Sequence, residues 1–334
     1  MAVLLGILAV LAFGIIPMVV YAIILWWFDR YEKEPLGLLV AAFLWGAVPS
    51  IIFSLVTQII LDLPIRLFVS PGAANLFGAV VTAPITEEFF KGLALLLLFI
   101  FFRHEIDTPL DGIIYGGLVG FGFAAVENVF YFTESLLSSG MGGLAVLSIL
   151  RAFVFGLNHA LFTGLTGLGI ALAYTSPNRI VRIVSPIGGL LLGMIAHSVH
   201  NLAVSLGSEL VWPCLIALIA DWGGVLVLLV VIVWTILRER HWIETHLEEE
   251  VDRGTLSREH YEVASSTVQR TTAQIQAFFD KGFHHWLKLS RYYRLATELA
   301  FSKHRLTRFP EDDETQERIE TLRQKVSGLE AEVA

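Results

Sequence analysis

The chain of 334 residues is 55% hydrophobic and only 16% charged, and its mean hydropathy is +0.68. Soluble globular domains carry about 25% charged residues, so this composition excludes an ordinary soluble protein and indicates a membrane protein. A single cysteine, Cys214, excludes an internal disulfide framework and a thiolate metal centre. The net charge of −8, with no stripe of Lys and Arg, argues against nucleic acid as a partner.

Apolar stretches follow one another from the N-terminus, and each is long enough to cross a hydrocarbon core of about 30 Å, which takes roughly 20 helical residues. The first stretch lacks a basic start and is too long for a signal peptide, so we expect it to be retained. The predicted spans are residues 3–28, 36–61, 84–103, 111–133, 147–174, 183–206 and 211–237. Together they predict an all-α, polytopic membrane helix bundle of about seven spans.

Residues 62–86 do not form a clean span, because Pro64, Pro71 and Pro84 interrupt them. This segment is interpreted as re-entrant, as an interfacial helix or as an eighth crossing. Within the other spans, glycines recur at three- or four-residue spacing, as in DGIIYGGLVGFGF at 111–123. Such small-residue faces predict seams where two helices pack closely.

Positive charge is divided unequally between the loops, and cytoplasmic loops of membrane proteins hold the excess. With seven spans, only Arg66 falls on one side. The other side receives Arg30, Lys33, Arg103, Arg179, Arg182, Arg238 and Arg240. We therefore predict a multi-pass protein of the cell membrane with its N-terminus outside and its C-terminus in the cytoplasm.

Charge returns after the last span, so we predict a membrane-embedded domain at 1–237 and a cytoplasmic helical tail at 238–334. The tail pattern predicts helices at 238–251, after a Ser257 cap, near 267–305 and after Pro310. The segment FFDKGFHHWLKLSRYYRL at 278–295 mixes aromatic and basic residues. Such a face suits lipid headgroups or a partner helix, so the bilayer and a cytoplasmic tail-binding protein are both candidate partners.

Polar side chains interrupt the middle spans, where a charged residue costs about 2.5–3.5 kcal/mol on the insertion scale and therefore needs a reason. Glu87 and Lys91 stand four residues apart with the acid first, so we expect Lys91 to neutralise one of the two adjacent carboxylates. Asp221 and Glu209 are interpreted as interfacial. The interrupting residues are Glu87, Glu88, Lys91, Glu127, Asn128, Arg151, Asn158, His159, Thr163, His197, His200 and Asn201.

Four separate spans thus each present an acid or an imidazole. A single membrane histidine more often only hydrogen-bonds a neighbouring helix, and Arg151 is interpreted as a packing residue or as compensation for Glu127. If the four spans converge, however, their side chains form a bundle-core site suited to a metal ion or to an activated water.

Four motifs in chain order carry a resemblance to a known family. They are EExxK at 87–91, FxxxEN at 123–128, HxxFT at 159–163 and HxxxN at 197–201. In this order they resemble the PrsW family of intramembrane proteases, and WFDRYEKEP at 27–35 looks like that family's N-terminal signature. The related CAAX prenyl endopeptidases and bacteriocin-immunity proteins have EExxxR, FxxxH and HxxxN, from which this chain departs at Lys91 and Glu127.

The resemblance implies an endopeptidase that uses a glutamate-activated water to cleave single-pass membrane proteins of the anti-sigma-factor type. By carry-over, Lys91 would compensate charge and the catalytic residues would be Glu87, Glu88, Glu127, His159, His197 and Asn201. The implied cofactor is either none or one divalent ion, zinc, with candidate ligands His159, His197, Glu88 and Glu127. Since Lys91 would repel a cation, the metal-free version is favoured.

Two other classes of protein remain open. A proton-coupled transporter would use intramembrane Glu and His as a proton relay, but it would also predict internal repeats, which the sequence does not show. An inert membrane sensor or scaffold would act through its tail, and the intact set of acids and histidines argues against it.

Overall fold

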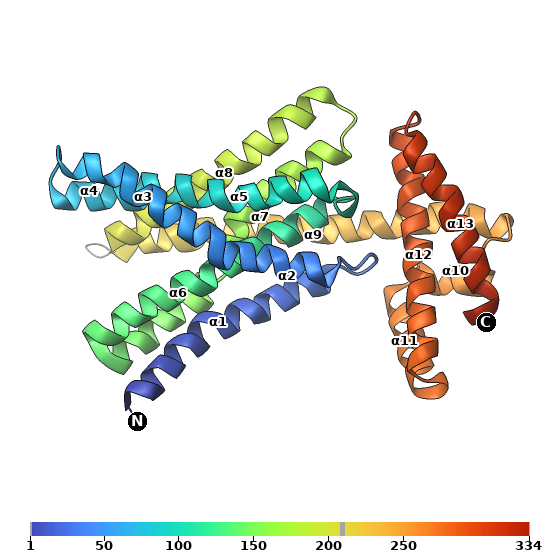
Figure 1. The fold of residues 1–334 in the computed structure, drawn as a ribbon, viewed down its shortest axis with the longest axis horizontal. Helices are drawn as coiled ribbons and strands as arrows, with labels where there is room; N and C mark the ends of the chain where they lie inside the picture. Colours follow the sequence, from blue (N-terminus) through green and yellow to red (C-terminus); the bar gives the residue numbers. More distant parts are fainter. Residues whose placement is uncertain (1, 208–210, 334) are drawn as a thin grey trace. The chain divides into compact units, whose positions relative to one another are not determined.

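The computed structural model describes residues 2–207 and 211–333, and Glu209 lies outside this range. All regular elements of the described residues are helices (Figure 1). The chain divides into two compact units: Met1–Phe28 with Glu34–Ile232, called here the membrane unit, and Asp29–Lys33 with Val233–Ala334, called the tail unit. The predicted domain boundary at residue 237 falls inside a long helix that belongs to both.

Helical segments follow one another through the membrane unit, and short π-helical turns (η1, η2 and η4) continue several of them. The segments are α1 (Ala2–Phe28), α2 (Leu36–Trp45), η1 (Gly46–Ser50), α3 (Ile51–Arg66), α4 (Pro71–Phe77), η2 (Gly78–Thr82), α5 (Ala83–Phe101), η3 (Arg103–Glu105), α6 (Pro109–Ser148), η4 (Ile149–Val154), α7 (Asn158–Thr175), α8 (Arg179–Gly207) and α9 (Val211–Asp252).

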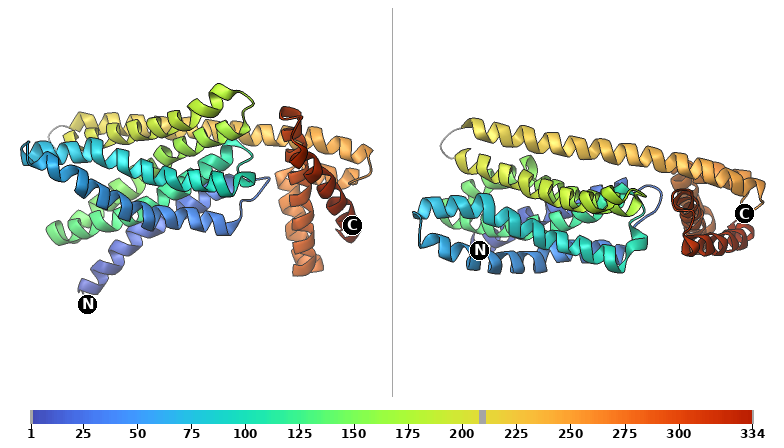
Figure 2. Two further views of the ribbon diagram at one scale, coloured as in Figure 1. Left: turned by 45° about the horizontal axis from the view of Figure 1, so that its top comes forward. Right: turned by 90° about the horizontal axis from the view of Figure 1, so that it is seen from above.

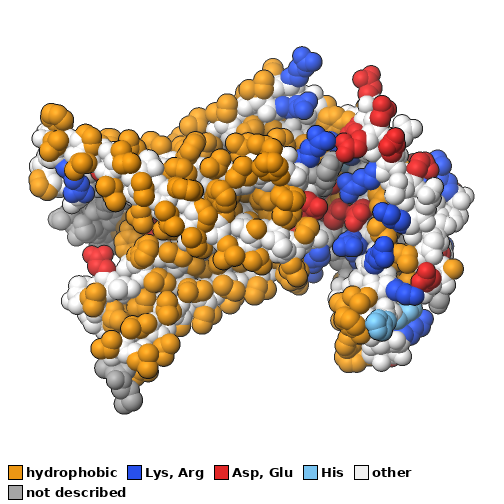
Figure 3. Space-filling model, in the orientation of Figure 1, with side chains coloured by type: hydrophobic (Ala, Val, Ile, Leu, Met, Phe, Trp, Pro, Cys, Tyr) orange, Lys and Arg blue, Asp and Glu red, His pale blue; other side chains and the backbone are white. Residues whose placement is uncertain are grey.

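Five stretches are long and apolar enough to cross a membrane, and hydrophobic side chains cover most of the visible face of this unit (Figure 3). These stretches are Val3–Phe28, Leu36–Arg66, Pro109–Thr175, Arg179–Gly207 and Trp212–Asp252. They make the chain a multi-pass membrane protein. The number of seven crossings stays a prediction.

The structure shows how the chain continues at two breaks between predicted spans. The 67-residue stretch Pro109–Thr175 turns back at Gly140, whose φ of 65° suits glycine, and Leu144 beyond the turn shares a hydrophobic cluster with Phe132. Residues 62–86 form no separate span. They supply the end of α3, a short turn, and the start of the continuous helical run α4–η2–α5, whose first helix is capped by Ser70.

Glycines allow the helices of the site to approach closely, as the spacing predicted. A Cβ atom on Gly120 of α6 would lie 2.2 Å from the carbonyl oxygen of His159. One on Gly193 of α8 would lie 2.4 Å from the carbonyl oxygen of Phe162. Because both partners lie on α7, only glycine at these positions lets α6 and α8 pack against the α7 backbone.

The tail unit is a small helical bundle with its own core. After α9 it contains α10 (Arg258–Ala264), α11 (Thr267–Lys281), α12 (Phe283–Arg308) and α13 (Asp313–Val333), which appear from a second direction in Figure 2. The Ser257 cap of α10 is present as predicted. The single helix predicted over 267–305 is wrong, because Gly282, with φ of 85°, separates α11 from α12.

Candidate active site

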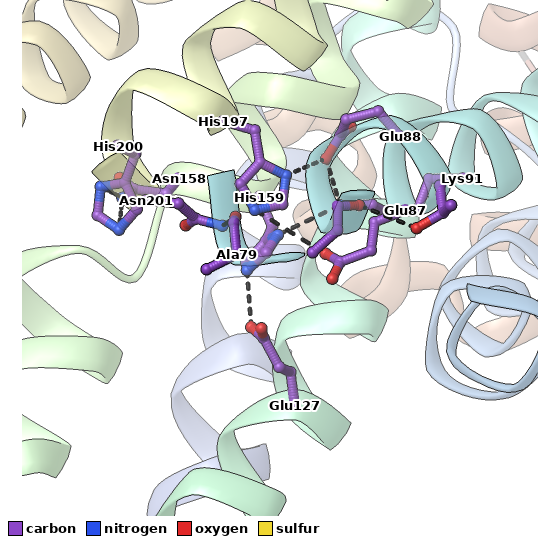
Figure 4. A network of polar contacts seen from close by, with 12 residues as sticks. Ala79, Glu87, Glu88, Lys91, Glu127, Asn158, His159, His197, His200 and Asn201 are labelled. Carbon is purple, nitrogen blue, oxygen red and sulfur yellow. Dashed lines mark hydrogen bonds and ion pairs between the residues drawn. The ribbon is translucent and has the colours of Figure 1, made fainter. Parts of the chain in front are cut away.

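The polar residues of the middle spans converge in the membrane unit, where α5, α6, α7 and α8 meet (Figure 4). Helix α5 brings Glu87 and Glu88, α6 brings Glu127, α7 brings His159, and α8 brings His197. The imidazoles of His159 and His197 meet edge to face, with ring centroids 5.1 Å apart. The convergence on which the sequence interpretation depended is therefore present.

Glu88 is fully buried and fully partnered. Its carboxylate pairs with Lys91, accepts a hydrogen bond from Thr163 Oγ1 at 3.0 Å, and lies 3.0 Å from His197 Nδ1. The expected neutralisation of an acid by Lys91 occurs, but the i,i+4 pair with Glu87 suggested by spacing is wrong, since Lys91 contacts its i,i+3 neighbour instead. Thr163 and His197 approach Glu88 from other helices, and this fixes Glu88 as the inner carboxylate.

Glu87 is held differently from its neighbour. Its Oε1 atom accepts a hydrogen bond from Gln58 Nε2 at 3.2 Å, whereas its Oε2 atom is buried without a hydrogen-bond partner. That free oxygen lies 3.9 Å from His197 Nε2. Glu87 therefore presents an unsatisfied carboxylate oxygen to the centre of the site. Gln58 was missed in the sequence, although a glutamine inside an apolar span is itself a signal.

His159 links Lys91 to Glu127. Lys91 Nζ lies 3.2 Å from His159 Nδ1, and His159 Nε2 lies 2.8 Å from Glu127 Oε2. Since an ammonium only donates, Nδ1 accepts and Nε2 carries the proton that is donated to Glu127. Arg151 Nη2 also donates to Glu127 at 2.6 Å, so the compensating role suggested for Arg151 is confirmed.

A second polar cluster was only partly expected. His200 Nδ1 lies 2.7 Å from Asp221 Oδ2, and Asn158 Nδ2 donates to the same oxygen at 3.0 Å. The interfacial interpretation of Asp221 is wrong, because this carboxylate is 3% exposed and binds residues of α7 and α8. Asn201, a predicted catalytic residue, donates to the carbonyl oxygen of Ala79 at 2.8 Å and joins α8 to η2 instead of contacting the acids.

A cavity of about 490 Å³ lies beside the acid–imidazole centre, in the size range of ligand-binding cavities. Of the six predicted catalytic residues, Glu88 alone does not line it. The polar lining residues are Glu87, Glu127, Asn128, Tyr131, Arg151, Asn158, His159, His197, His200, Asn201, Ser205 and Cys214. Most of the remaining lining residues are apolar and come from α6, η4, α8 and α9.

Three side chains of the centre also fit a metal ion. Glu87, His159 and His197 offer ligand atoms that all lie within 4.8 Å of one another. Glu88 contacts His197 Nδ1, so the Nε2 lone pair of His197 points toward the unpartnered oxygen of Glu87. A carboxylate behind a histidine is the usual support of a metal-binding imidazole. Glu88, which the sequence analysis named as a candidate ligand, therefore lies behind His197 as its supporting carboxylate and is not among the three residues that fit the ion.

The structure therefore contains an intramembrane centre of acids and imidazoles, which lies beside a cavity inside a multi-pass helix bundle. The chain matches the PrsW family of intramembrane metalloproteases over residues 34–237, more than half of its length, and it belongs to this family. The resemblance drawn from the four motifs is thereby confirmed. The tail after residue 237 lies outside the match.

Curated relatives match parts of the chain as well. Protease PrsW of Geobacillus kaustophilus is 34% identical over 140 residues, which cover 42% of this chain and 55% of that protein. Protease PrsW of Oceanobacillus iheyensis is 27% identical over 202 residues, 58% of this chain and 82% of that protein. That of Clostridioides difficile is 35% identical over 133 residues, 39% and 54%. The chain thus spans about half the length of two of these relatives. No solved structure matches it.

Proposed function

We propose that the protein is an intramembrane endopeptidase that hydrolyses peptide bonds of membrane-anchored substrate proteins. The observation that carries the proposal is the convergence of Glu87, Glu127, His159 and His197 on one cavity within a membrane bundle. Membership of the PrsW family supports hydrolysis over the proton-coupled transporter and the inert scaffold.

In the metal-free form of the proposed mechanism, Glu87 is the base. Its unpartnered Oε2 atom accepts a proton from a water molecule while the water oxygen attacks the scissile carbonyl carbon. The same proton then passes from Glu87 to the leaving nitrogen as the carbon–nitrogen bond breaks. Glu88 orients His197, and the Glu127–Arg151 pair places a compensated charge on the wall of the cavity.

As a second form of the mechanism, we propose that a divalent cation binds to Glu87, His159 and His197. Glu87 would then be a ligand and not the base, and His159 would exchange the contact of one ring nitrogen with Lys91 or Glu127 for the ion. When bound, it would supply Lewis-acid polarisation of the substrate carbonyl. Lys91 repels such a cation less than the sequence analysis assumed, because its charge is paired with Glu88.

The metal proposal predicts about one bound divalent ion per chain, since two histidines and one carboxylate are a common catalytic zinc set. Elemental analysis of purified protein measures it. The His197→Ala and Glu87→Ala variants should lose the ion, whereas His200→Ala, a histidine of the same helix that binds Asp221 instead, should keep it. A metal-free preparation with full activity would contradict the proposal and restore the metal-free mechanism favoured from sequence.

For substrates and topology we keep the expectations drawn from sequence. The proposed substrates are single-pass membrane proteins of the anti-sigma-factor type, the N-terminus lies outside, and the tail lies in the cytoplasm. A cytoplasmic partner of the tail is proposed as well.

The activity is tested without knowledge of the substrate by comparing cells that express the wild-type protein or the Glu87→Gln variant. Gln keeps the size of the side chain but removes the base. We expect new protein N-termini, located in or beside membrane segments of other proteins, only in wild-type membranes. Identical sets of N-termini at equal expression of the two proteins would exclude proteolysis.

A further inference from the structure

A second cavity, of about 320 Å³, reaches Glu87 from the side of α3. It shares Glu87, Glu127 and Tyr131 with the larger cavity, so the two cavities meet at the carboxylates of Glu87 and Glu127. The mechanism above uses only the larger one. The remaining polar lining comes mainly from α3 and from Asn75 on α4.

The polar residues of α3 form one stripe. Ser54, Gln58, Asp62 and Arg66 are spaced four residues apart, so they lie on a single helix face, and all four line the second cavity. The stripe begins at a buried serine, passes the Gln58 that binds Glu87, and ends at an exposed arginine in the last turn of α3. It therefore connects the acid centre with the end of the helix.

Polar atoms along this stripe lack partners within the protein. Ser54 Oγ, Asp62 Oδ1 and Glu87 Oε2 are buried and make no hydrogen bond. Buried polar atoms are nearly always hydrogen-bonded, and in roomy polar cavities water is their partner. The face of α3 beside the stripe is apolar: Ile59 is 68% exposed and Leu63 is 62% exposed. The helix thus separates a hydrocarbon face from a face suited to water.

We propose that the second cavity is the route by which water reaches Glu87, with the Ser54–Gln58–Asp62–Arg66 stripe as its polar wall. The proposal rests on the proposed hydrolysis, in which every cleaved bond consumes one water molecule inside a hydrocarbon layer. Gln58 binds Glu87 at the inner end, and Asp62 and Arg66 hydrate the outer end. The larger cavity is left to the substrate segment.

Thiol labelling tests whether the stripe is wet. In full-length protein in lipid vesicles with Cys214 replaced by Ser, we introduce Gln58→Cys or Asp62→Cys, and as matched controls Ile59→Cys or Leu63→Cys. The probe is a charged, membrane-impermeant methanethiosulfonate, which reacts with the thiolate and therefore requires water. We expect stripe cysteines to react at least about tenfold faster than their neighbours. Equal, slow rates would show a dry cavity and overturn the proposal.

A substitution that narrows the second cavity, called here a plug, tests whether water reaches Glu87 by this route. A Cβ atom on Gly78, which lines the cavity, would lie 3.0 Å from Asp62 Oδ2, so Gly78→Val narrows the passage and removes no polar group. With Glu87→Cys as the reporter, the plug should slow labelling at position 87 about tenfold. Gly72→Val on α4 is the control, since no atom lies within 4 Å of its added Cβ.

Labelling at position 87 that is unaffected by the plug would mean that water arrives through the larger cavity. Asp62→Leu provides a second plug if Gly78→Val does not fold. Because the reporter is catalytically silent, the outcomes separate the two proposals. A wet stripe in a chain that cleaves nothing would contradict only the proposed function, and a dry stripe in an active protease would contradict only the water route.

Discussion

Lys91 is a fully buried cation whose surroundings explain its position. Its ammonium group contacts Glu88, His159 and the ring of Phe123, whose centroid lies 4.3 Å away. Removing one partner of a buried ion pair leaves an uncompensated charge. We therefore predict that Lys91→Met lowers the free energy of unfolding by about 3–5 kcal/mol, measured by denaturation of the full chain in detergent.

The double variant Lys91→Met with Glu88→Gln is the control, because it removes both charges together. It should recover most of the lost stability, although Thr163 and His197 keep only a neutral partner. If Lys91→Met alone is as stable as the wild type, the ammonium group is hydrated and the buried pair has been misassigned.

Sequence reasoning identified the residues of the centre but not all of their partners. A charged residue in an apolar span is conspicuous in any sequence, and motif order placed Glu87, Glu127, His159 and His197 on different helices. Partner choice, however, depends on which helix packs where. Lys91 binds Glu88 because α7 and α8 bring Thr163 and His197 to that same carboxylate. Spacing along α5 alone cannot supply this information.

Two adjacent glycines of α8 show how helix packing positions the site. A Cβ on Gly189 would lie 2.4 Å from the carbonyl oxygen of Leu165 on α7, whereas one on Gly188 would meet no atom within 4 Å. Gly189→Ala should therefore push α8 away from α7 and lower the free energy of unfolding by about 1–3 kcal/mol. Because α8 carries His197, activity should also fall. Gly188→Ala is the matched control, and equal effects of the two variants would contradict the tight seam.

The tail helices are joined by a buried charge that makes a pH prediction possible. Glu250 of α9 is 0% exposed and accepts hydrogen bonds from Lys303 of α12 at 2.8 Å and from Arg323 of α13 at 2.8 Å. Burial alone would raise the pKa of Glu250, but these bonds and one from Thr255 lower it from 4.5 to about 2. The native tail thus favours the ionised carboxylate.

A lowered pKa in the folded state gives stability that is complete above about pH 4.5 and is lost as pH falls toward 2. The loss should reach about 3 kcal/mol, measured as lower amide protection factors, corrected for the intrinsic exchange rate at each pH, in α12 and α13 of the full chain. Glu250→Gln should make the exchange less sensitive to pH over this window, whereas the exposed Glu311→Gln should not. A wild-type tail that is insensitive to acid would contradict the assignment.

Hydropathy located the helices well, because a membrane span must satisfy its backbone hydrogen bonds internally and is marked by its length. The interruption that prolines predicted within residues 62–86 is absent where a proline lies near the start of a helix. Pro71 begins α4 and Pro84 follows η2, positions that an N-terminal turn tolerates, so neither ends the helical run to Phe101. Gly282 had the opposite effect, since a single glycine with positive φ divided a helix that the pattern predicted as continuous.

At the scale of the molecule, the first loop and the tail belong together. Asp29–Lys33 are part of the tail unit, where Tyr31 is 3% exposed within the hydrophobic core. Arg270, itself buried, donates to the carbonyl oxygen of Tyr31 at 2.9 Å and to Thr297 Oγ1 at 3.0 Å. The first five residues of the DRYEKEP segment, noted in the sequence as a family signature, thus supply part of the core of a unit that otherwise begins at Val233.

This arrangement bears on the number of crossings. A loop and a tail that share one core lie on the same side of the membrane, so the chain between them crosses an even number of times. Six crossings between the first loop and the tail, and seven in total, satisfy this condition. An added crossing within residues 62–86 would not.

We therefore predict that residues 29–33 and the C-terminus are cytoplasmic, while the turn between α3 and α4, which follows Arg66, is outside. Excess Lys and Arg on the first side gives the direction, and the shared core gives the parity. Reporters that are active on only one side of the membrane, inserted in the α3–α4 turn or fused after residue 334, should give opposite results. An outside signal from the C-terminal fusion would reverse the orientation. Matching signals from both sites would require an even number of crossings between the turn and the tail, and the seven-span assignment would then be wrong.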